Sequence, residues 1–165
     1  MGLPKRKPTR LKGYDYSTAG AYFITVCSKD REHIFGKIVG GGDFDAPQMI
    51  LSNYGNILDK YINLMNKKYS YLKIDKYIVM PNHLHLILII SNDKNGASET
   101  AAPYNNEISK FLSLLKRYCN NEIGKNIFQS SFHDHIIRDE RDYKKIWEYI
   151  DTNIIRWEKD CFYNS

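Results

Sequence analysis

The sequence predicts an α+β fold, in which helices pack on both faces of one antiparallel β-sheet. Short runs rich in β-branched and aromatic residues alternate with longer stretches of helical periodicity. Their order is strand, helix, strand, strand, helix, strand, followed by an extra helix. The first six elements have the order of the ferredoxin-like (RRM-like) split unit. We therefore expect two helices on one face of the sheet and the final helix on the other.

The first half of the chain is expected to supply one strand and one helix to this unit. Residues 21–27 (AYFITVC) predict a strand because β-branched and aromatic side chains dominate the run. Residues 33–39 predict a short second strand, and the glycine-rich residues 40–47 predict a loop. A helix is expected to begin at Asn53, with Ser52 or Asn53 as its N-cap. Its apolar positions follow the helical period: Tyr54, Ile57, Leu58, Tyr61, Leu64 and Met65.

The second half of the chain is expected to complete the unit and to add the extra helix. Residues 72–80 and 83–90 predict two strands that pair antiparallel around a turn at Pro81-Asn82. Residues 91–103 are small, polar and aperiodic, which predicts a connecting segment. The remaining elements are a helix over residues 106–119, a strand over 132–138, and a last helix from its N-cap Asp139 to about Lys159.

Composition predicts one basic domain. Lys and Arg number 24 against 19 acidic residues, and this net charge of +5 suits a partner made of phosphates without identifying one. Residues 1–13 predict a flexible basic arm, and residues 14–165 a single domain. Three widely spaced cysteines indicate neither a disulfide framework nor a zinc motif. The longest apolar run, residues 84–90, is too short to cross a bilayer. We expect a cytoplasmic protein with no membrane partner.

Two histidines near the middle of the chain are candidate metal ligands. Side chains alternate between faces along a strand, so His83 and His85 point the same way, about 7 Å apart along the backbone, where two imidazoles can share one ion. A His-x-His pair alone indicates this only weakly. Both faces of residues 83–90 are otherwise apolar, so both must be covered. The final helix is the element left to cover the face that carries the histidines.

The final helix carries a tyrosine and an asparagine one turn apart. Tyr149 and Asn153 share one edge of its apolar face, from which side chains can reach into a cleft. The amide oxygen of Asn153 is a candidate third metal ligand, and the Tyr149 hydroxyl is a candidate nucleophile toward a phosphate. Tyr143 is expected to be a packed ring. The apolar face consists of Tyr143, Ile146, Ile150, Ile154 and Trp157.

Three motifs together resemble a known family. They are residues 80–85 (MPNHLH), the Tyr149-x-x-x-Asn153 pair, and residues 132–138 (FHDHIIR). The combination resembles the single-tyrosine HUH transposases, and most of all the REP-associated tyrosine transposases. These are relatives of the insertion-sequence transposases that move as single strands. The resemblance covers nearly the whole chain and is far more specific than any one of the motifs.

The resemblance implies an HUH endonuclease fold and a strand-transfer reaction. It implies that His83 and His85 bind a divalent metal, Mg²⁺ or Mn²⁺, that Asn153 completes the metal site, and that Tyr149 attacks a backbone phosphate. The products would be a 5′-phosphotyrosine and a free 3′-hydroxyl. The implied partner is single-stranded DNA with hairpin structure. A homodimer is an open alternative, because the insertion-sequence relatives are dimers and the REP-associated ones need not be.

One residue departs from the family pattern. Ile154 follows Asn153 where the pattern leads us to expect proline, so the helix is free to continue to Lys159.

Basic residues outside the motifs are candidate contacts for the DNA backbone, because phosphate binding depends on Lys and Arg. The candidates are Lys110, Lys116 and Arg117 on the second helix, Arg10 and Lys12 in the basic arm, and His135.

Several alternatives stay open. His133 and His135 form a second strand-spaced pair, which is a candidate for accepting the phenolic proton and an alternative metal site. A non-catalytic RRM-like nucleic-acid-binding module would use the same fold without cleaving DNA. A metal-dependent nuclease that activates water would need the histidines and tolerate the loss of Tyr149.

Overall fold

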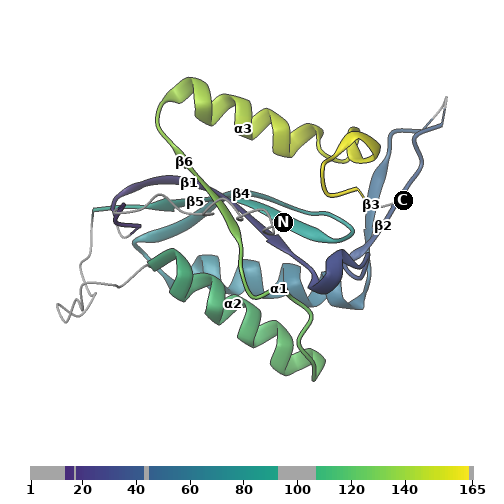
Figure 1. Ribbon diagram of the computed structural model, residues 1–165, viewed down its shortest axis with the longest axis horizontal. Coiled ribbons are helices and arrows are strands. Elements are labelled where there is room, and N and C mark those ends of the chain that lie inside the picture. The colour runs from purple at the N-terminus through teal and green to yellow at the C-terminus, as the bar shows by residue number, and fades with distance from the viewer. Residues whose placement is uncertain (1–13, 17, 43–44, 93–106, 164–165) are drawn as a thin grey trace, which may run out of the picture.

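A four-stranded antiparallel sheet organises the chain (Figure 1). The computed structural model describes residues 14–16, 18–42, 45–92 and 107–163, so the predicted arm at 1–13 lies outside the described residues. The strands, in the order β4-β5-β1-β6, confirm the predicted ferredoxin-like arrangement. Their bounds are β1 Gly20–Cys27, β4 Leu72–Val79, β5 His83–Ile90 and β6 His133–Ile137.

Two helices cover one face of this sheet, as predicted (Figure 1). Helix α1 (Asn53–Lys68) connects towards β4, and α2 (Glu107–Ile123) connects β5 to β6. Ser52 caps α1 by accepting a hydrogen bond from the Gly55 N–H at 3.1 Å, which satisfies one of the free donors of the first turn. Gly55 also lets α1 pack directly against the backbone at Phe35, because an added Cβ would lie 2.0 Å from the Phe35 carbonyl oxygen.

An insertion separates β1 from α1. It consists of the 3-10 helix η1 (Lys29–Arg31) and a hairpin of β2 (Gly36–Val39) with β3 (Gln48–Leu51). The strand predicted over 33–39 is therefore shorter than expected, and β3 was not expected at all. A four-residue run directly after Pro47 carries too little periodicity to predict a strand, and its pairing with β2 stabilises it.

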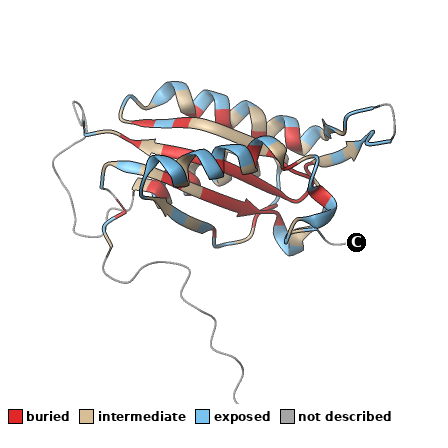
Figure 2. Cartoon of the chain, turned by 90° about the horizontal axis from the view of Figure 1, so that it is seen from above, coloured by how far each residue is buried: buried red, intermediate tan, exposed pale blue. Residues whose placement is uncertain are grey.

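The central strand β5 divides the core into two clusters. Leu84, Leu86 and Leu88 belong to the large cluster under α1 and α2. Ile87, on the other face, packs with Ile146 and Ile150 of the third helix, α3 (Glu140–Thr152). Figure 2 shows the buried residues concentrated in the strands of the sheet. The predicted sandwich of α1 and α2 on one face and α3 on the other is confirmed (Figure 1).

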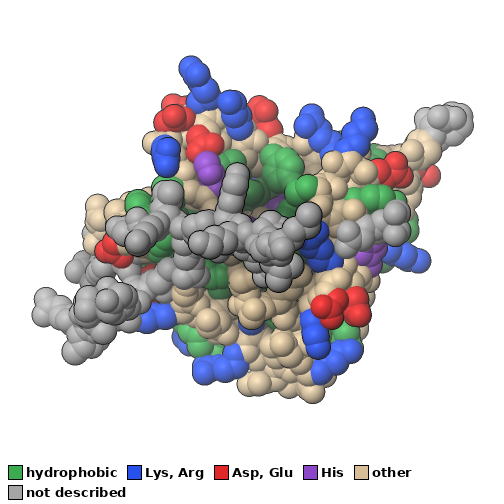
Figure 3. Space-filling view, viewed as in Figure 1, with side chains coloured by type: hydrophobic (Ala, Val, Ile, Leu, Met, Phe, Trp, Pro, Cys, Tyr) green, Lys and Arg blue, Asp and Glu red, His purple; other side chains and the backbone are tan. Residues whose placement is uncertain are grey.

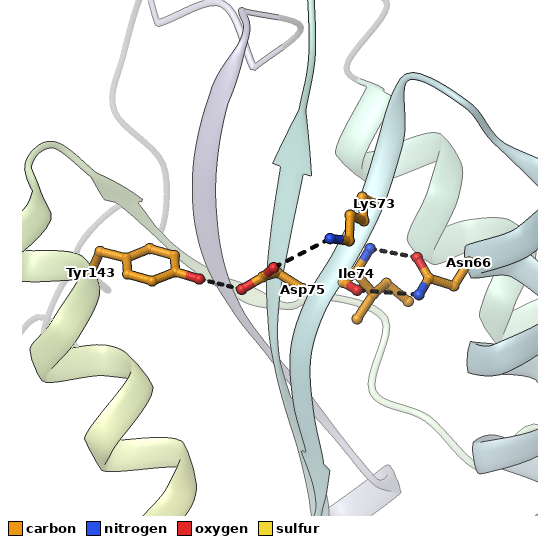
Figure 4. A network of polar contacts seen from close by, with 5 residues as sticks. All are labelled: Asn66, Lys73, Ile74, Asp75 and Tyr143. Carbon is orange, nitrogen blue, oxygen red and sulfur yellow. Dashed lines mark hydrogen bonds and ion pairs between the residues drawn. The ribbon is translucent and has the colours of Figure 1, made fainter.

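A β-bulge in β4 fastens α3 to the sheet. The register shifts between Ile74 and Lys76, so Asp75 and Lys76 both face α3 although they are consecutive. Tyr143 of α3 donates a hydrogen bond to the Asp75 carboxylate, which also faces Lys73 at 3.7 Å (Figure 4). As predicted, the Tyr143 ring also packs against the cluster under α3.

Side chains on both sides of the bulge hold it in place. Asn66 of α1 accepts a hydrogen bond from the Ile74 N–H at 2.7 Å and donates one to the Ile74 carbonyl at 3.2 Å (Figure 4). Further along α3, Lys76 pairs with Asp151 at 2.8 Å and lies over the ring of Trp147. The helix is thus attached to β4 near both of its ends.

Helix α3 is shorter than expected. It begins after the predicted N-cap Asp139, whose side chain accepts from the Asp142 N–H, but it ends at Thr152 instead of continuing to Lys159. The chain then passes through turns and the 3-10 helix η2 (Trp157–Lys159). Proline is therefore not needed to end α3. Trp157 becomes buried against the rings of His33 and His83, and a straight helix could not bring it back there.

None of the described helices is both long and apolar enough to cross a membrane.

Candidate functional site

The two predicted histidines lie side by side beneath the end of α3. His83 and His85 are both buried, and their Nε2 atoms are 3.0 Å apart. They share the face of β5 that α3 covers, because the strand alternation places them with Ile87. Thr25, the cross-strand neighbour of His85, lies with its Oγ1 2.8 Å from His85 Nδ1.

Asn82 determines which nitrogen of His83 is free. Its amide nitrogen donates to the carbonyls of Arg31 at 3.2 Å and Phe162 at 2.8 Å, so its oxygen faces His83 Nδ1 at 2.8 Å. The Nδ1 atom must then carry the proton, which leaves a lone pair on His83 Nε2. A neutral imidazole in this tautomer can bind a metal ion through Nε2, while the hydrogen bond at Nδ1 fixes the orientation of the ring. The sequence predicted Asn82 only as a turn residue.

The structure brings Tyr149 to the histidines and buries Asn153 one turn further along the chain. The Tyr149 hydroxyl lies 3.3 Å from His85 Nε2, and its ring centroid is 5.3 Å from that of His85. Asn153 is buried at the end of α3. Its Oδ1 has no hydrogen-bond partner among the described residues, although a buried amide oxygen normally has one.

Asp160 completes the cluster, and the sequence did not predict it. Its Oδ2 accepts hydrogen bonds from the Tyr149 hydroxyl at 2.9 Å and from Asn153 Nδ2 at 3.0 Å. Its Oδ1 accepts from the Phe162 N–H at 2.7 Å, which shapes the turn after η2. In a continuous helix, eleven residues would carry Asp160 about 16 Å beyond Tyr149. The early end of α3 is what returns it, so no local signal could have indicated this contact.

Aromatic rings close the site on the side of the C-terminal turn. The ring centroid of Phe162 lies 4.7 Å from that of His83 and 5.9 Å from that of His85. Trp157 adds a second ring 5.8 Å from His83. These rings exclude water from the imidazoles, which strengthens electrostatic interactions at the site.

Burial controls protonation at the site. Burial lowers the pKa of His83 to about 4, although the nearby Asp160 acts in the opposite direction. Burial also lowers the pKa of His85 well below its ordinary value, and the neighbouring His83 adds to this effect. The two imidazoles are therefore neutral near pH 7 and can donate lone pairs. Burial, with the adjacent Asp160 carboxylate, raises the pKa of Tyr149, so its phenol carries its proton in this state.

These residues fit a divalent metal ion. Among the described residues, the group of three potential ligands that converges is His83, His85 and Asp160, whose ligand atoms lie within 4.8 Å of one another. Two nitrogens bonded to one ion at about 2.1 Å and at a right angle would be about 3.0 Å apart, as the two Nε2 atoms are. Asn153, whose Oδ1 has no hydrogen-bond partner among the described residues, is linked to this group by the hydrogen bond from its Nδ2 to Asp160. The alternative pair, His133 and His135, is not part of this group.

The predicted DNA contacts on α2 lie away from the site. Lys110 and Arg117 are exposed on α2, across the sheet from α3 (Figure 1). Lys116 donates to the backbone carbonyls of Gln129, Ser130 and Ser131 at 2.7 to 3.3 Å, and burial lowers its pKa to about 8. These bonds occupy its three N–H donors.

Of the remaining predicted contacts, the structure describes His135 alone. His135 is exposed on β6, and its Nε2 is 2.8 Å from the Asp142 carboxylate. Arg10 and Lys12 lie outside the described residues.

Comparison with known proteins gives both sequence relatives and a structural relative. No protein-family model matches the chain. An uncharacterised protein of Haemophilus influenzae is 33% identical, and the match covers 98% of this chain and 95% of that protein. The REP-associated tyrosine transposase of Escherichia coli is 23% identical, with 87% of this chain and 73% of that protein covered.

One solved structure with a similar fold is that of a REP-associated tyrosine transposase bound to a REP hairpin. It superposes with a TM-score of 0.59 at 20% identity, covering 84% of this chain and 68% of that one. At this identity, the likeness shows that the two proteins share a fold. By sequence and fold together, the chain resembles the REP-associated tyrosine transposases.

Proposed function

We propose that this protein cleaves and rejoins single-stranded DNA, with Tyr149 as the nucleophile. The observation that carries the proposal is the position of the Tyr149 hydroxyl, 3.3 Å from His85 Nε2 and 2.9 Å from Asp160 Oδ2. A phenol beside two neutral imidazoles and a carboxylate is an arrangement suited to attack on a phosphate. The resemblance to the REP-associated tyrosine transposases supports a nucleic-acid-processing enzyme, and the REP hairpin of the structural relative suggests hairpin-bearing DNA as the substrate.

The reaction conserves the number of phosphoester bonds. The Tyr149 oxygen forms a bond to phosphorus while the bond from phosphorus to the 3′ oxygen breaks. The phenolic proton is released, and the departing 3′ oxygen takes up a proton. This leaves a 5′-phosphotyrosine and a free 3′-hydroxyl, and a second 3′-hydroxyl can reverse the exchange without a nucleotide cofactor.

His83 and His85 would hold a divalent ion through their Nε2 atoms. The bound ion would neutralise the charge that grows on the phosphate oxygens. Two side chains are candidates for the third position: Asn153, through its unpartnered Oδ1, and Asp160, through a carboxylate oxygen. Two imidazoles with a carboxylate suit Mn²⁺ or a similar transition ion, whereas Mg²⁺ prefers a shell of oxygen ligands.

Asp160 has a second candidate role, because its Oδ2 already accepts the Tyr149 hydrogen bond. It is therefore the acceptor in contact with the phenolic proton, whereas His135 is engaged by Asp142. If Asp160 is the metal ligand, Asp160→Asn weakens Mn²⁺ binding measured by calorimetry, and Asn153→Ala leaves it nearly unchanged. The opposite result assigns the metal to Asn153 and leaves Asp160 as the proton acceptor.

Two of the predicted α2 cations remain proposed backbone contacts for DNA outside the cleavage site. Lys110 and Arg117 are exposed and can meet phosphates, whereas Lys116 already uses its donors within the protein. The other proposed contacts are Arg10, Lys12 and His135.

The test uses a hairpin-bearing single-stranded DNA labelled at one end, incubated with the protein and Mn²⁺, and run on a denaturing gel. A 3′-labelled strand should become attached to the protein, and a 5′-labelled strand should give a shorter free fragment. Tyr149→Phe and His83→Ala should each abolish the attached band. Tyr118→Phe on α2 is the matched control and should retain it, because Tyr118 lies across the sheet from the site.

The same gel separates the rival functions. Cleavage that survives Tyr149→Phe would identify a nuclease that activates water. DNA binding without any cleavage would identify a non-catalytic module.

A further inference from the structure

A hollow of about 490 Å³ opens beside the phenol of Tyr149. It is lined by Tyr149, Arg156, Lys159 and Asp160, so one wall comes from α3 and the others from the segment that follows it. Its volume lies within the range of about 300 to 1,000 Å³ that is common for ligand sites. The proposed nucleophile thus borders a space that can receive a nucleotide-sized group.

The charges of the two cations that line this hollow are not neutralised by a neighbouring acid within the described ranges. Arg156 and Lys159 are exposed, and within the described ranges neither side chain has an ion-pair partner. The carboxylate of Asp160 is instead directed at Tyr149 and Asn153, from which it accepts hydrogen bonds. The two cations therefore outnumber the acid, and the hollow favours an anion.

A second hollow, on α3 itself, differs from the first in its balance of charges. It has a volume of about 730 Å³, and it lies along the first half of α3. Figure 3 shows that Lys and Arg side chains gather over both ends of the layer formed by α3 and the segment after it. Acids balance the cations in this second hollow, and Lys144 pairs with Glu140 at 2.7 Å. Its lining residues are Asp139, Glu140, Arg141, Lys144, Lys145 and Glu148.

We infer that Arg156 and Lys159 bind the phosphodiester of single-stranded DNA that Tyr149 attacks. This inference rests on the proposed function and assigns the substrate contact at that site. The guanidinium of Arg156 can hold two phosphate oxygens at once, and the Lys159 ammonium adds a mobile point charge. Both come from the segment that carries Asp160, so the turn that completes the site also positions the substrate.

The test measures binding separately from cleavage. In a Tyr149→Phe background, fluorescence anisotropy gives the affinity for a DNA that carries either a phosphodiester or a neutral methylphosphonate at the mapped cleavage position. The methylphosphonate should weaken binding about 10-fold, because it removes charge-assisted hydrogen bonds. Adding Arg156→Ala and Lys159→Ala should weaken binding of the normal DNA by a similar factor and remove the difference between the two DNAs.

The control removes the same two residue types from α3 itself. Arg141→Ala with Lys144→Ala removes one Arg and one Lys from the balanced hollow, and it should leave the methylphosphonate effect intact. A methylphosphonate effect of equal size with and without Arg156 and Lys159 would overturn the inference. Should the double alanine variant unfold, Arg156→Gln with Lys159→Gln gives the same comparison.

Covalent attachment by the otherwise wild-type protein tells the two proposals apart. If no attachment occurs with Tyr149 present, the proposed function fails. If attachment occurs, and Arg156→Ala with Lys159→Ala neither slows it in single-turnover measurements nor changes the methylphosphonate effect, only the phosphate contact fails.

Discussion

On one face of the sheet, β5 presents Leu84, Leu86 and Leu88 to α1 and α2, and on the other it presents His83 and His85 to α3 and the C-terminal turn. The first face is an extended apolar core, in which stability comes from burial of hydrocarbon. The second has a small apolar cluster next to buried polar groups. One of these, Asn153 Oδ1, lacks a partner among the described residues.

The difference teaches how a small domain can hold a reactive site. Buried polar atoms without partners lower the free energy of unfolding. Burial of apolar side chains in the large cluster on the opposite face offsets this loss. The helix above the site is held by a smaller apolar cluster and, in addition, by directed contacts from Asp75 and Lys76. Because the side chains of β5 alternate between faces, one strand contributes both to the large apolar core and to the candidate site on the opposite face.

The largest expected effect is on the α1 and α2 face. Leu86→Ala should lower the free energy of unfolding by about 2 to 5 kcal/mol, because Leu86 is fully buried and its removal leaves a cavity in packed core. Urea denaturation followed by circular dichroism measures this loss. If Leu86→Ala lowers the free energy of unfolding by less than Ile150→Ala does on the α3 face, the proposed difference in stability between the two faces is wrong.

The next effect concerns the buried imidazoles and depends on pH. In metal-free protein, the pKa of His83 is about 4 and that of His85 is well below its ordinary value of 6.5. Between about pH 4 and 6.5, the unfolded chain therefore binds more protons than the folded one, so stability falls as the pH falls. The loss for His83 is at most about 3 kcal/mol. Unfolding in EDTA across this range measures it.

A variant identifies the source of this pH dependence. His83→Gln with His85→Gln should flatten the stability profile between about pH 4 and 6.5. A slope that persists in the double variant would assign the pH dependence to other groups.

On the α3 face, Ile150→Ala should lower the free energy of unfolding by about 2 kcal/mol. Ile150 is buried, but its cluster borders half-buried residues, and the helix can shift to fill part of the cavity. The change should slow DNA attachment more than Leu86→Ala does, because Ile150 is adjacent to Tyr149 on the helix. Parallel urea and single-turnover measurements on both variants make the comparison, and equal slowing by the two would count against it.

The smallest effect concerns the contact across the β4 bulge. Tyr143→Phe removes the hydrogen bond to Asp75 and should cost about 1 kcal/mol, because the carboxylate still faces Lys73 and stays partly solvated. Thermal unfolding of Tyr143→Phe beside Tyr118→Phe measures the difference. If the two variants match, the bulge contact contributes nothing to the attachment of α3.

Local pattern determined most of the fold. Alternation along β5 predicted that the histidines share one face, and helical periodicity in the last element predicted that Tyr149 and Asn153 lie at one edge of α3. Both follow from backbone geometry, which repeats every two residues in a strand and every 3.6 in a helix. The strand β3 escaped prediction because it is short and is stabilised by its partner β2.

Tertiary packing decided the rest of the site. The bulge turns both Asp75 and Lys76 towards α3, which the regular alternation of a strand would not allow. The end of α3 at Thr152 depends on burial of Trp157 and Phe162 against rings far away in the sequence. The sequence by itself therefore determined which residues face the site from regular elements. Only the folded chain could bring Asp160 to Tyr149, because that contact depends on where an irregular segment finds apolar surface to cover.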